Sequence, residues 1–223
     1  GMQHRYLHPG DSSKKAVIVI TSNRGLAGGY NSNVIKLITR GDLKKEDLEI
    51  YSIGKKGKDS LGRYGYHIAW DGSDIIEEPA YADALQLSNR LLQEFAAGSI
   101  GEIYLAYTWF KNTVVHVPKL MKLLPVEAGG KEPEMSADKG VQEEEKKLSI
   151  PMNFEPKDEE ALDLLIPKYI TSLIYGAMVE AVASENGARM QAMDSATSNA
   201  EEMISNLTLQ YNRARQGSIT QEL

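Results

Sequence analysis

The sequence predicts an α/β fold in which a mostly parallel sheet with flanking helices is followed by one long C-terminal helix. A continuous apolar run at 16–20, rich in β-branched residues, indicates a strand buried on both faces, as in a parallel sheet. Strand and helix patterns then alternate along the chain, which is the order of an α/β layer structure. After Pro156 the alternation stops, and the stretch 158–216, with Pro167 as its one internal proline, predicts the long helix.

The sheet elements follow one another in a regular order. A glycine-rich turn and then a helix at 32–39 come after the first strand. The next predicted elements are a strand at 48–53, a helix at 58–64, a strand at 66–70 and a helix at 81–95. We expect the crossovers between these strands to be right-handed and the strands to be parallel.

The last two predicted strands, 100–110 and 113–120, are joined at Lys111 and Asn112. A joint of this length predicts an antiparallel hairpin, which we expect at one edge of the sheet.

Composition divides the chain into three parts. Residues 127–147 mix glycine and proline with acidic residues, which is typical of a loop or linker. We therefore expect an α/β sheet domain at 1–126, an acidic linker at 127–155 and the long helix at 156–223.

The predicted helix is too long to be covered by the sheet. At ~1.5 Å per residue, 158–216 spans about 90 Å, whereas a domain of ~130 residues has a radius of gyration of about 14 Å. We expect the part up to Ala183 to pack on the sheet and the rest to extend beyond it. The outer part carries a heptad-spaced seam consisting of Met193, Ala196, Ala200, Met203, Leu207 and Ala214.

A seam of this kind is ordinarily the buried face of a core helix. Here the length argues against that interpretation, and the sequence has no second long helical pattern to cover the seam. The partner is another copy of the chain, another protein, or a segment that this sequence lacks.

Composition excludes several classes of function. The 223 residues carry 25 basic and 31 acidic side chains, a net charge of −6, which argues against a nucleic-acid-binding protein. The absence of cysteine excludes disulfide scaffolds, thiolate metal sites and cysteine nucleophiles. No apolar run reaches the ~18 residues of a membrane span, and the sequence does not open on a signal peptide.

Two glycine-containing turns are the candidates for nucleotide binding. Gly25–Gly29 lies between a strand and a helix, where the phosphates of a dinucleotide would sit, but its glycine spacing differs from the dinucleotide fingerprint. Gly54–Ser60 resembles a phosphate loop, but only Lys55 and Lys56 separate its first two glycines. Tight turns that need glycine are the favoured interpretation, so we expect no cofactor.

The histidines and the other polar residues do not predict a metal or catalytic site. His4 and His8, four residues apart, are a possible metal pair without a nearby third ligand. His67 and His116 are isolated in predicted strands, and no nucleophile–base pattern stands out. We therefore expect no metal and no catalytic residue.

Two segments carry a specific resemblance. Val19–Asn33 (VITSNRGLAGGYNSN) resembles the first strand and loop of the gamma subunit of F-type ATP synthases. Ala183–Ala200 (ASENGARMQAMDSATSNA) and Leu207–Leu223 (LTLQYNRARQGSITQEL) resemble the C-terminal helix of that family. The resemblance extends over the whole chain in the order of its elements and implies a Rossmann-like sheet domain.

The resemblance also implies what the seam meets. Gamma subunits open with a long helix that pairs with the C-terminal one in an antiparallel coiled coil. It implies that this sequence lacks that helix, with Gly1 and Met2 marking the cut, and lacks about two final helical turns. The chain by itself is then expected to be a monomer or a weak dimer.

A rotor function is implied by the same resemblance. The gamma subunit stands in the hexamer of catalytic alpha and beta subunits, and its base contacts the membrane c-ring beside the epsilon subunit. Proton-driven rotation of the c-ring turns it and forces the catalytic sites through their conformations. The implied location is peripheral, on the cytoplasmic side of a bacterial plasma membrane, and the implied subunit is not itself an enzyme.

Particular residues take family roles by position. Arg189 resembles the arginine that faces the lever region of the catalytic subunits, and Arg215, Gln216 and Thr220 resemble the residues gripped near the top of the stalk. Glu155 resembles the foot residue near the c-ring. A nucleotide-dependent α/β enzyme and a homodimeric scaffold are the alternatives to this rotor hypothesis.

Overall fold

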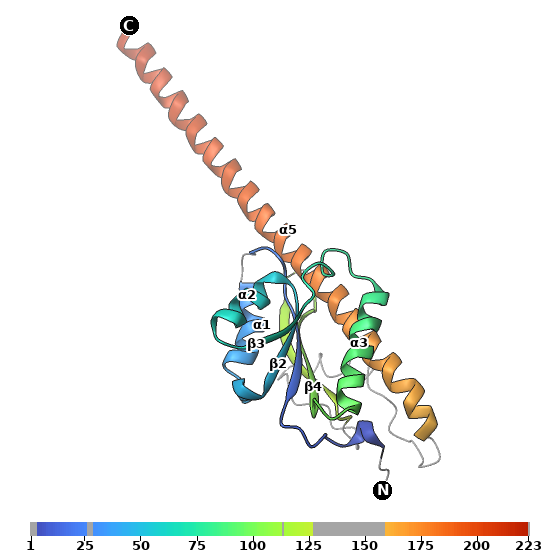
Figure 1. Cartoon of the computed structure of the whole chain (residues 1–223). Coiled ribbons are helices and arrows are strands. Elements are labelled where there is room, and N and C mark those ends of the chain that lie inside the picture. The colour runs from blue at the N-terminus through green and yellow to red at the C-terminus, as the bar shows by residue number, and fades with distance from the viewer. Residues whose placement is uncertain (1–3, 26–28, 113, 127–158, 223) are drawn as a thin grey trace.

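A computed structural model describes residues 4–25, 29–112, 114–126 and 159–222 of the chain. A five-stranded sheet lies between two pairs of helices, and one helix extends far beyond it (Figure 1). The elements are η1 (Arg5–Leu7), β1 (Lys15–Ile20), α1 (Tyr30–Thr39), η3 (Lys45–Asp47), β2 (Leu48–Ile53), α2 (Lys55–Arg63), β3 (His67–Asp71), α3 (Tyr81–Ala96), β4 (Glu102–Phe110), β5 (His116–Leu124) and α5 (Glu159–Glu222).

The sheet has the order β3-β2-β1-β4-β5. The pairs β1–β2, β2–β3 and β1–β4 are parallel, and β4–β5 is antiparallel at the edge. The predicted fold class is therefore confirmed, including the antiparallel edge hairpin.

Alternation along β1 builds a core on each face of the sheet. Successive side chains of a strand point to opposite faces. Val17 and Val19 pack with apolar residues of α1 and α2, whereas Ile18 and Ile20 pack with those of α3 and α5. All four are fully buried, which explains why this strand reads as an unbroken apolar run.

The hairpin joint differs from its prediction. β5 begins at His116, three residues later than expected, because Asn112 organises a longer turn. Its Oδ1 accepts hydrogen bonds from the backbone N–H groups of Val114 and Val115, at 2.9 and 2.8 Å. An asparagine side chain can replace a backbone acceptor in this way and so extend a turn.

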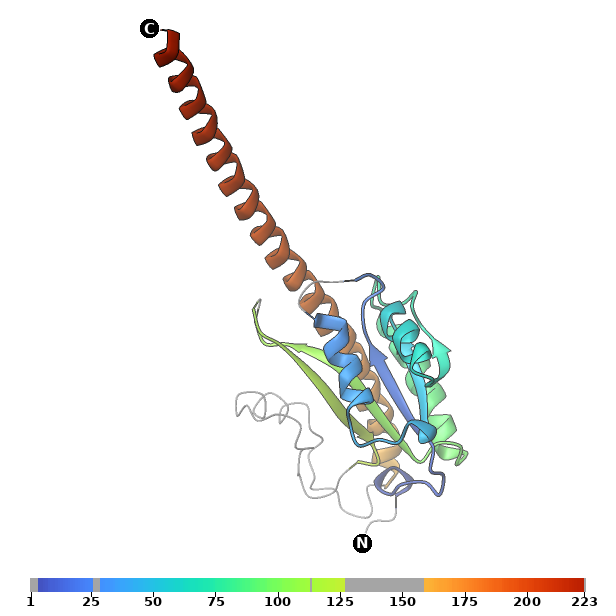
Figure 2. The same ribbon diagram turned by 90° about the vertical axis from the view of Figure 1, so that its left-hand side faces the viewer.

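α5 packs on the sheet through its first half only. The residues that β4 and α3 cover recur at helical spacing and are Leu162, Ile166, Ile170, Ile174, Met178 and Ala181. Every residue from 190 to 217, called here the outer segment, is exposed. Figure 2 shows this segment leaving the sheet domain, with the C-terminus at its far tip.

α5 continues through Pro167 without interruption. Proline removes one helical N–H donor, and a kink is the usual consequence. Its neighbours Ile166 and Ile170 are fully buried against the sheet, and the Thr171 hydroxyl donates to the Pro167 carbonyl at 2.7 Å. Packing on both sides of the proline keeps the helix whole.

Among the described residues, the stretch Glu160–Gly217 of α5 is long enough and apolar enough to meet the length and composition criteria for a membrane span. The sequence prediction considered only continuous apolar runs, so it predicted this helix but did not identify it as meeting these criteria. Of the 18-residue apolar stretch of α5 that meets the criteria, 44% is buried inside the protein. Packing on the sheet therefore accounts for much of the apolar character of this helix.

The predicted division of the chain stays a prediction at its linker. Residues 127–158 lie outside the described residues, so the predicted acidic linker at 127–155 and Glu155 lie outside them too. Within the described part, α5 begins at Glu159.

Candidate functional site

The point where α5 leaves the sheet domain brings together the residues that the motif segments contain. We call α5 residues 180–189 and the groups that contact them the neck. The Tyr30 hydroxyl, from the first residue of α1, donates to the Ala181 carbonyl at 3.0 Å. The backbone N–H of Phe110, at the end of β4, donates to Glu180 Oε2 at 3.1 Å. The carboxyl edge of the sheet therefore holds the last packed turn of α5.

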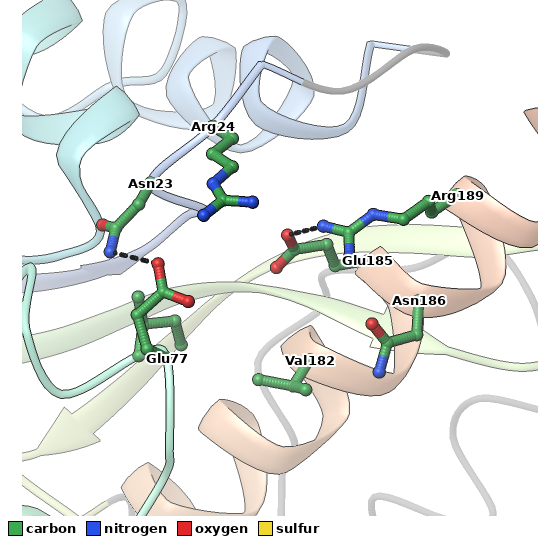
Figure 3. A pocket seen from close by; sticks show the side chains of 8 residues that line it. Asn23, Arg24, Glu77, Val182, Glu185, Asn186 and Arg189 are labelled. Carbon is green, nitrogen blue, oxygen red and sulfur yellow. Dashed lines mark hydrogen bonds and ion pairs between the residues drawn. The ribbon is translucent and has the colours of Figure 1, made fainter.

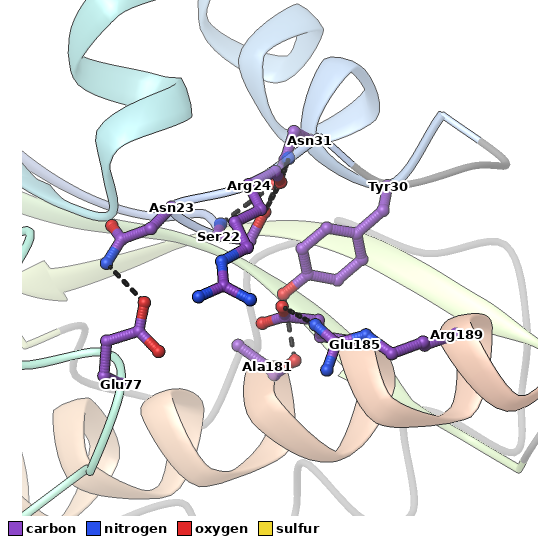
Figure 4. A network of polar contacts seen from close by, with 9 residues as sticks. All are labelled: Ser22, Asn23, Arg24, Tyr30, Asn31, Glu77, Ala181, Glu185 and Arg189. Carbon is purple, nitrogen blue, oxygen red and sulfur yellow. Dashed lines mark hydrogen bonds and ion pairs between the residues drawn. The ribbon is translucent and has the colours of Figure 1, made fainter.

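A polar loop after β1 forms one wall of the neck (Figure 4). Asn31 fixes the loop from α1: its Oδ1 accepts from Ser22 N at 3.0 Å, and its Nδ2 donates to Ser22 Oγ at 2.8 Å. Asn23 Nδ2 donates to Glu77 Oε1 at 2.9 Å, which joins the loop to the segment after β3. These bonds present Arg24 toward α5.

A polar cavity of about 200 Å³ lies between this loop and α5 (Figure 3). Its charged lining residues are Arg24, Glu77, Glu185 and Arg189. Arg189 Nη2 donates to Glu185 Oε1 at 2.9 Å within the helix. The four charges balance, so the cavity is polar without a net charge.

Burial controls the titration of two neck residues. Burial raises the pKa of Glu185, and the Arg189 guanidinium opposes that rise. Burial, followed by the Glu185 carboxylate, also raises the pKa of the Tyr30 phenol. Tyr30 therefore keeps the proton that it donates to Ala181.

The first amides of α2 are already bonded within the protein, which argues against a phosphate loop at Gly54–Ser60. The N–H groups of Lys55, Lys56 and Gly57 donate to Asn23 Oδ1, Ser22 O and Thr21 Oγ1 at 2.9, 3.0 and 2.8 Å. A phosphate at a helix N-terminus needs these groups free.

The glycines of this turn are needed for close packing. Gly54 has φ +117°, and a Cβ there would lie 2.1 Å from the Thr21 carbonyl oxygen. At the other candidate turn, Gly29 has φ +73° at the start of α1, in agreement with the tight-turn interpretation, while residues 26–28 lie outside the described residues.

Two of the histidines, His4 and His67, have polar partners within the protein. His4 Nε2 lies 2.9 Å from Asp163 Oδ1, and its Nδ1 accepts from the Tyr6 N–H at 3.2 Å. Both ring nitrogens of His4 are thus engaged within the protein. His67 contacts Glu49 on the neighbouring strand.

The seam residues lie along the outer segment together with Arg215 and Gln216, and Thr220 lies beyond its end. Met193, Met203 and Leu207 are 60%, 64% and 57% exposed. The alanines of the seam, with Arg215 and Gln216, are also exposed. The backbone of Thr220 is helical, and its side chain lies outside the described residues.

Sequence reasoning missed most of the neck. Tyr30 and Glu185 lie in the motif segments, but nothing in their spacing connects them. Glu77 comes from an irregular loop and Glu180 from the middle of a helix. The one available signal was that two motif segments far apart in sequence must meet if they serve one site.

Comparisons with known proteins identify the family of the chain. Residues 1–223 match the ATP synthase family. An ATP synthase gamma chain from Lachnoclostridium phytofermentans is 61% identical over 224 residues, covering 100% of this chain and 75% of the relative. A gamma chain from Acetobacterium woodii, named as sodium ion specific, is 42% identical over 94% of this chain and 72% of its own length.

Solved structures share the fold. A chain of the central stalk and c-ring of the Tetrahymena thermophila mitochondrial ATP synthase aligns with TM-score 0.58 and 22% identity, over 83% of this chain and 77% of that one. A chain of the Euglena gracilis mitochondrial enzyme, in a structure of its F1 and c-ring, aligns with TM-score 0.60 and 17% identity, over 95% and 70%. With the high identity to the curated relatives, these findings show that the chain belongs to the ATP synthase gamma chain family.

Proposed function

We propose that this chain is the central-stalk rotor subunit of an F-type ATP synthase and couples proton-driven rotation of the c-ring to ATP synthesis or hydrolysis. The observation that carries the proposal is α5, which is anchored on a sheet domain at one end and has every residue from 190 to 217 exposed at the other. Family membership supports the same role.

The geometry suits a mechanical role. A shaft must join a body that is driven to a surface that acts on the catalytic subunits. Contacts that change with the angle of the shaft favour a different conformation of each catalytic site, so rotation shifts their relative free energies. The outer segment supplies such a surface, since the face that carries the seam differs in its side chains from the opposite face.

We assign the seam to a partner helix in an antiparallel coiled coil. The six seam residues keep heptad spacing along the outer segment, where no part of the described chain covers them. A medium-sized apolar stripe that is exposed over several turns is typical of a surface that a partner buries.

We assign Arg189, Arg215, Gln216 and Thr220 to contacts with the catalytic alpha and beta subunits. Arg189 lies at the neck, and the other three lie near the tip of α5. We assign Glu155, which lies outside the described residues, to the c-ring, and we expect the epsilon subunit beside the sheet domain. We accordingly infer a peripheral location at the cytoplasmic face of a bacterial plasma membrane.

We infer that the subunit is itself non-catalytic. The hydrogen bonds of the first α2 amides support this inference, because they use the N–H groups of Gly54–Ser60, the turn that resembles a phosphate loop. Calorimetric titration of the chain with ATP, ADP and NAD(P) should give no micromolar binding. Tight binding that is lost on changing the Gly25–Gly29 turn would favour the nucleotide-dependent enzyme instead.

The rotor proposal is tested in the assembled enzyme. Replacing Arg215 and Gln216 together with alanine should lower ATP turnover and rotation rate about fivefold, the effect of losing roughly 1 kcal/mol of interface contact. The double variant Arg63→Ala and Gln93→Ala, on exposed positions of α2 and α3, is the matched control. Equal rates in both double variants would reject the assigned contacts.

A further inference from the structure

The last packed turn of α5 governs the direction of everything beyond it. Ala177, Met178 and Ala181 are buried, whereas the helix is exposed from 190 onward. The outer segment is a lever of about 40 Å, at ~1.5 Å per residue. A tilt of about 5° at the neck would move the tip of this lever by roughly 3.5 Å, so a small change in direction at the neck becomes a large displacement at the far end.

Apolar packing alone defines this direction poorly. Two of the three buried residues at this turn are alanines, whose small side chains interlock little with their surroundings. Burial of apolar surface is also non-directional, so it resists separation of the helix from the sheet more than rotation about its axis.

Two hydrogen bonds supply the missing directionality. Tyr30 OH holds the backbone of α5 through the Ala181 carbonyl, and Phe110 N–H holds a side chain of α5 through Glu180. Adjacent residues of an α-helix lie about 100° apart around its axis. The two restraints therefore act from different directions, one from α1 and one from β4.

The ion pair at the neck cannot do this. Arg189 and Glu185 belong to the same helix and lie one turn apart. Their bond moves with α5 as a unit and places no restraint on α5 relative to the sheet domain.

We propose that Tyr30 and Glu180 are positioning residues that fix the tilt and rotation of α5 where it leaves the sheet domain. Their consequence for ATP turnover rests on the proposed rotor function. The positioning itself does not, and it is measurable in the chain alone.

The absence of cysteine allows spin labels to be placed at chosen sites. One label pair joins Asn89→Cys on α3 to Ser205→Cys on the outer segment, and a second joins Arg63→Cys on α2 to the same Ser205→Cys. All three positions are exposed. Pulsed electron–electron double resonance measures the distance between the labels of each pair and so reports the position of the outer segment from two directions.

The double variant Tyr30→Phe and Glu180→Leu removes both restraints. Both bonds are removed together because a single hydrogen bond contributes modestly. Without them α5 is free to tilt and rotate at the neck, so we expect the distance distributions of both label pairs to shift or to become about twofold broader. Glu180→Gln keeps an acceptor oxygen for Phe110 N–H and should retain the parent distributions, a rescue that a general packing defect would not give.

The matched control is the double variant Tyr211→Phe and Glu201→Leu, which makes the same changes on the exposed outer segment. It should leave both distributions unchanged. The proposal is overturned if the neck variant, shown by circular dichroism to be folded, keeps the parent distributions. It is also overturned if the control broadens them equally. If the double neck variant does not fold, Glu180→Leu alone is compared with Glu180→Gln. The leucine variant should then shift or broaden both distributions, and parent distributions in both single variants would overturn the proposal.

Discussion

At the scale of single residues, the neck places a carboxylate in an unfavourable position. Glu185 is 17% exposed, and burial raises its pKa despite the ion pair with Arg189. The folded protein therefore binds a proton more readily at this position than the unfolded chain does. The charged form weakens the fold at neutral pH, a cost that is common at positions kept for function.

The Glu185→Gln variant tests this cost. Burial raises the pKa of folded Glu185 above its ordinary value near 4.5. The stability that this group contributes is therefore fully present below that pH and is lost as pH rises through the folded pKa. The glutamine variant keeps an acceptor for Arg189 but cannot lose a proton. Its free energy of unfolding should gain on the parent protein as pH rises from about 4 to 7.

Denaturant unfolding across that pH range provides the measurement. Glu201→Gln on the outer segment, where the side chain is exposed, should show no such widening gap. A constant difference between Glu185→Gln and the parent at all pH values would contradict the assignment.

Gly54 is a second residue whose role can be measured. Both Gly54 and Gly98 have positive φ, at +117° and +83°, but a Cβ at Gly54 would meet Thr21 O at 2.1 Å while nothing lies within 4 Å at Gly98. Gly98→Ala should cost ~1 kcal/mol from its backbone conformation alone. Gly54→Ala should cost about 3 kcal/mol or more, because the turn must also move. Equal losses in thermal unfolding would exclude the steric contribution.

At the scale of elements, α5 consists of two parts with different sources of stability. Tertiary packing stabilises the part on the sheet, whereas the outer segment depends on helix propensity alone. Isolated helices are marginal in water, and local opening is easiest where few contacts must break. The same helix should therefore open much more readily beyond the neck than before it.

Hydrogen exchange should resolve this difference residue by residue. Backbone amides at 190–217 are expected to exchange at least ~100-fold faster than those at 162–181, after correction for intrinsic rates. Protection of the outer segment at a level that rises with protein concentration would instead indicate pairing between copies, the homodimeric alternative.

The elements also show which features the sequence could predict. The strand at 48–53 has the predicted bounds because its largely apolar pattern, Leu-Glu-Ile-Tyr-Ser-Ile ending at Gly54, is a local signal. α2 begins at Lys55 rather than at 58, because the groups that cap it, Thr21 and Asn23, come from more than 30 residues earlier. Propensity and periodicity do not report such a pairing.

The neck was unpredictable for the same reason. Joining Tyr30 to Ala181 requires knowing which turn of α5 lies over the carboxyl edge of the sheet, and that depends on tertiary packing. The seam, by contrast, was readable, because its heptad spacing is a property of one segment.

At the scale of the whole molecule, the outer segment gives a direct test of what it meets. Leu207 and Leu209 are 57% and 53% exposed, and they lie on nearly opposite faces of one turn. Only Leu207 belongs to the seam. Because neither contacts the sheet domain, Leu207→Glu and Leu209→Glu should each change the stability of the chain alone by no more than ~0.5 kcal/mol.

In the assembled enzyme the two variants should differ. If a partner helix covers the seam, Leu207→Glu buries a carboxylate in an apolar interface, at a cost of roughly 2 kcal/mol or more, whereas Leu209→Glu keeps its charge away from that interface. We expect assembly and ATP-driven rotation to fall in the first variant and to be preserved in the second. Equal behaviour would reject the assigned seam, and the reverse order would place the partner on the Leu209 face. Because both substitutions add the same charge at nearly the same height along α5, the comparison isolates the face of the helix as the one variable.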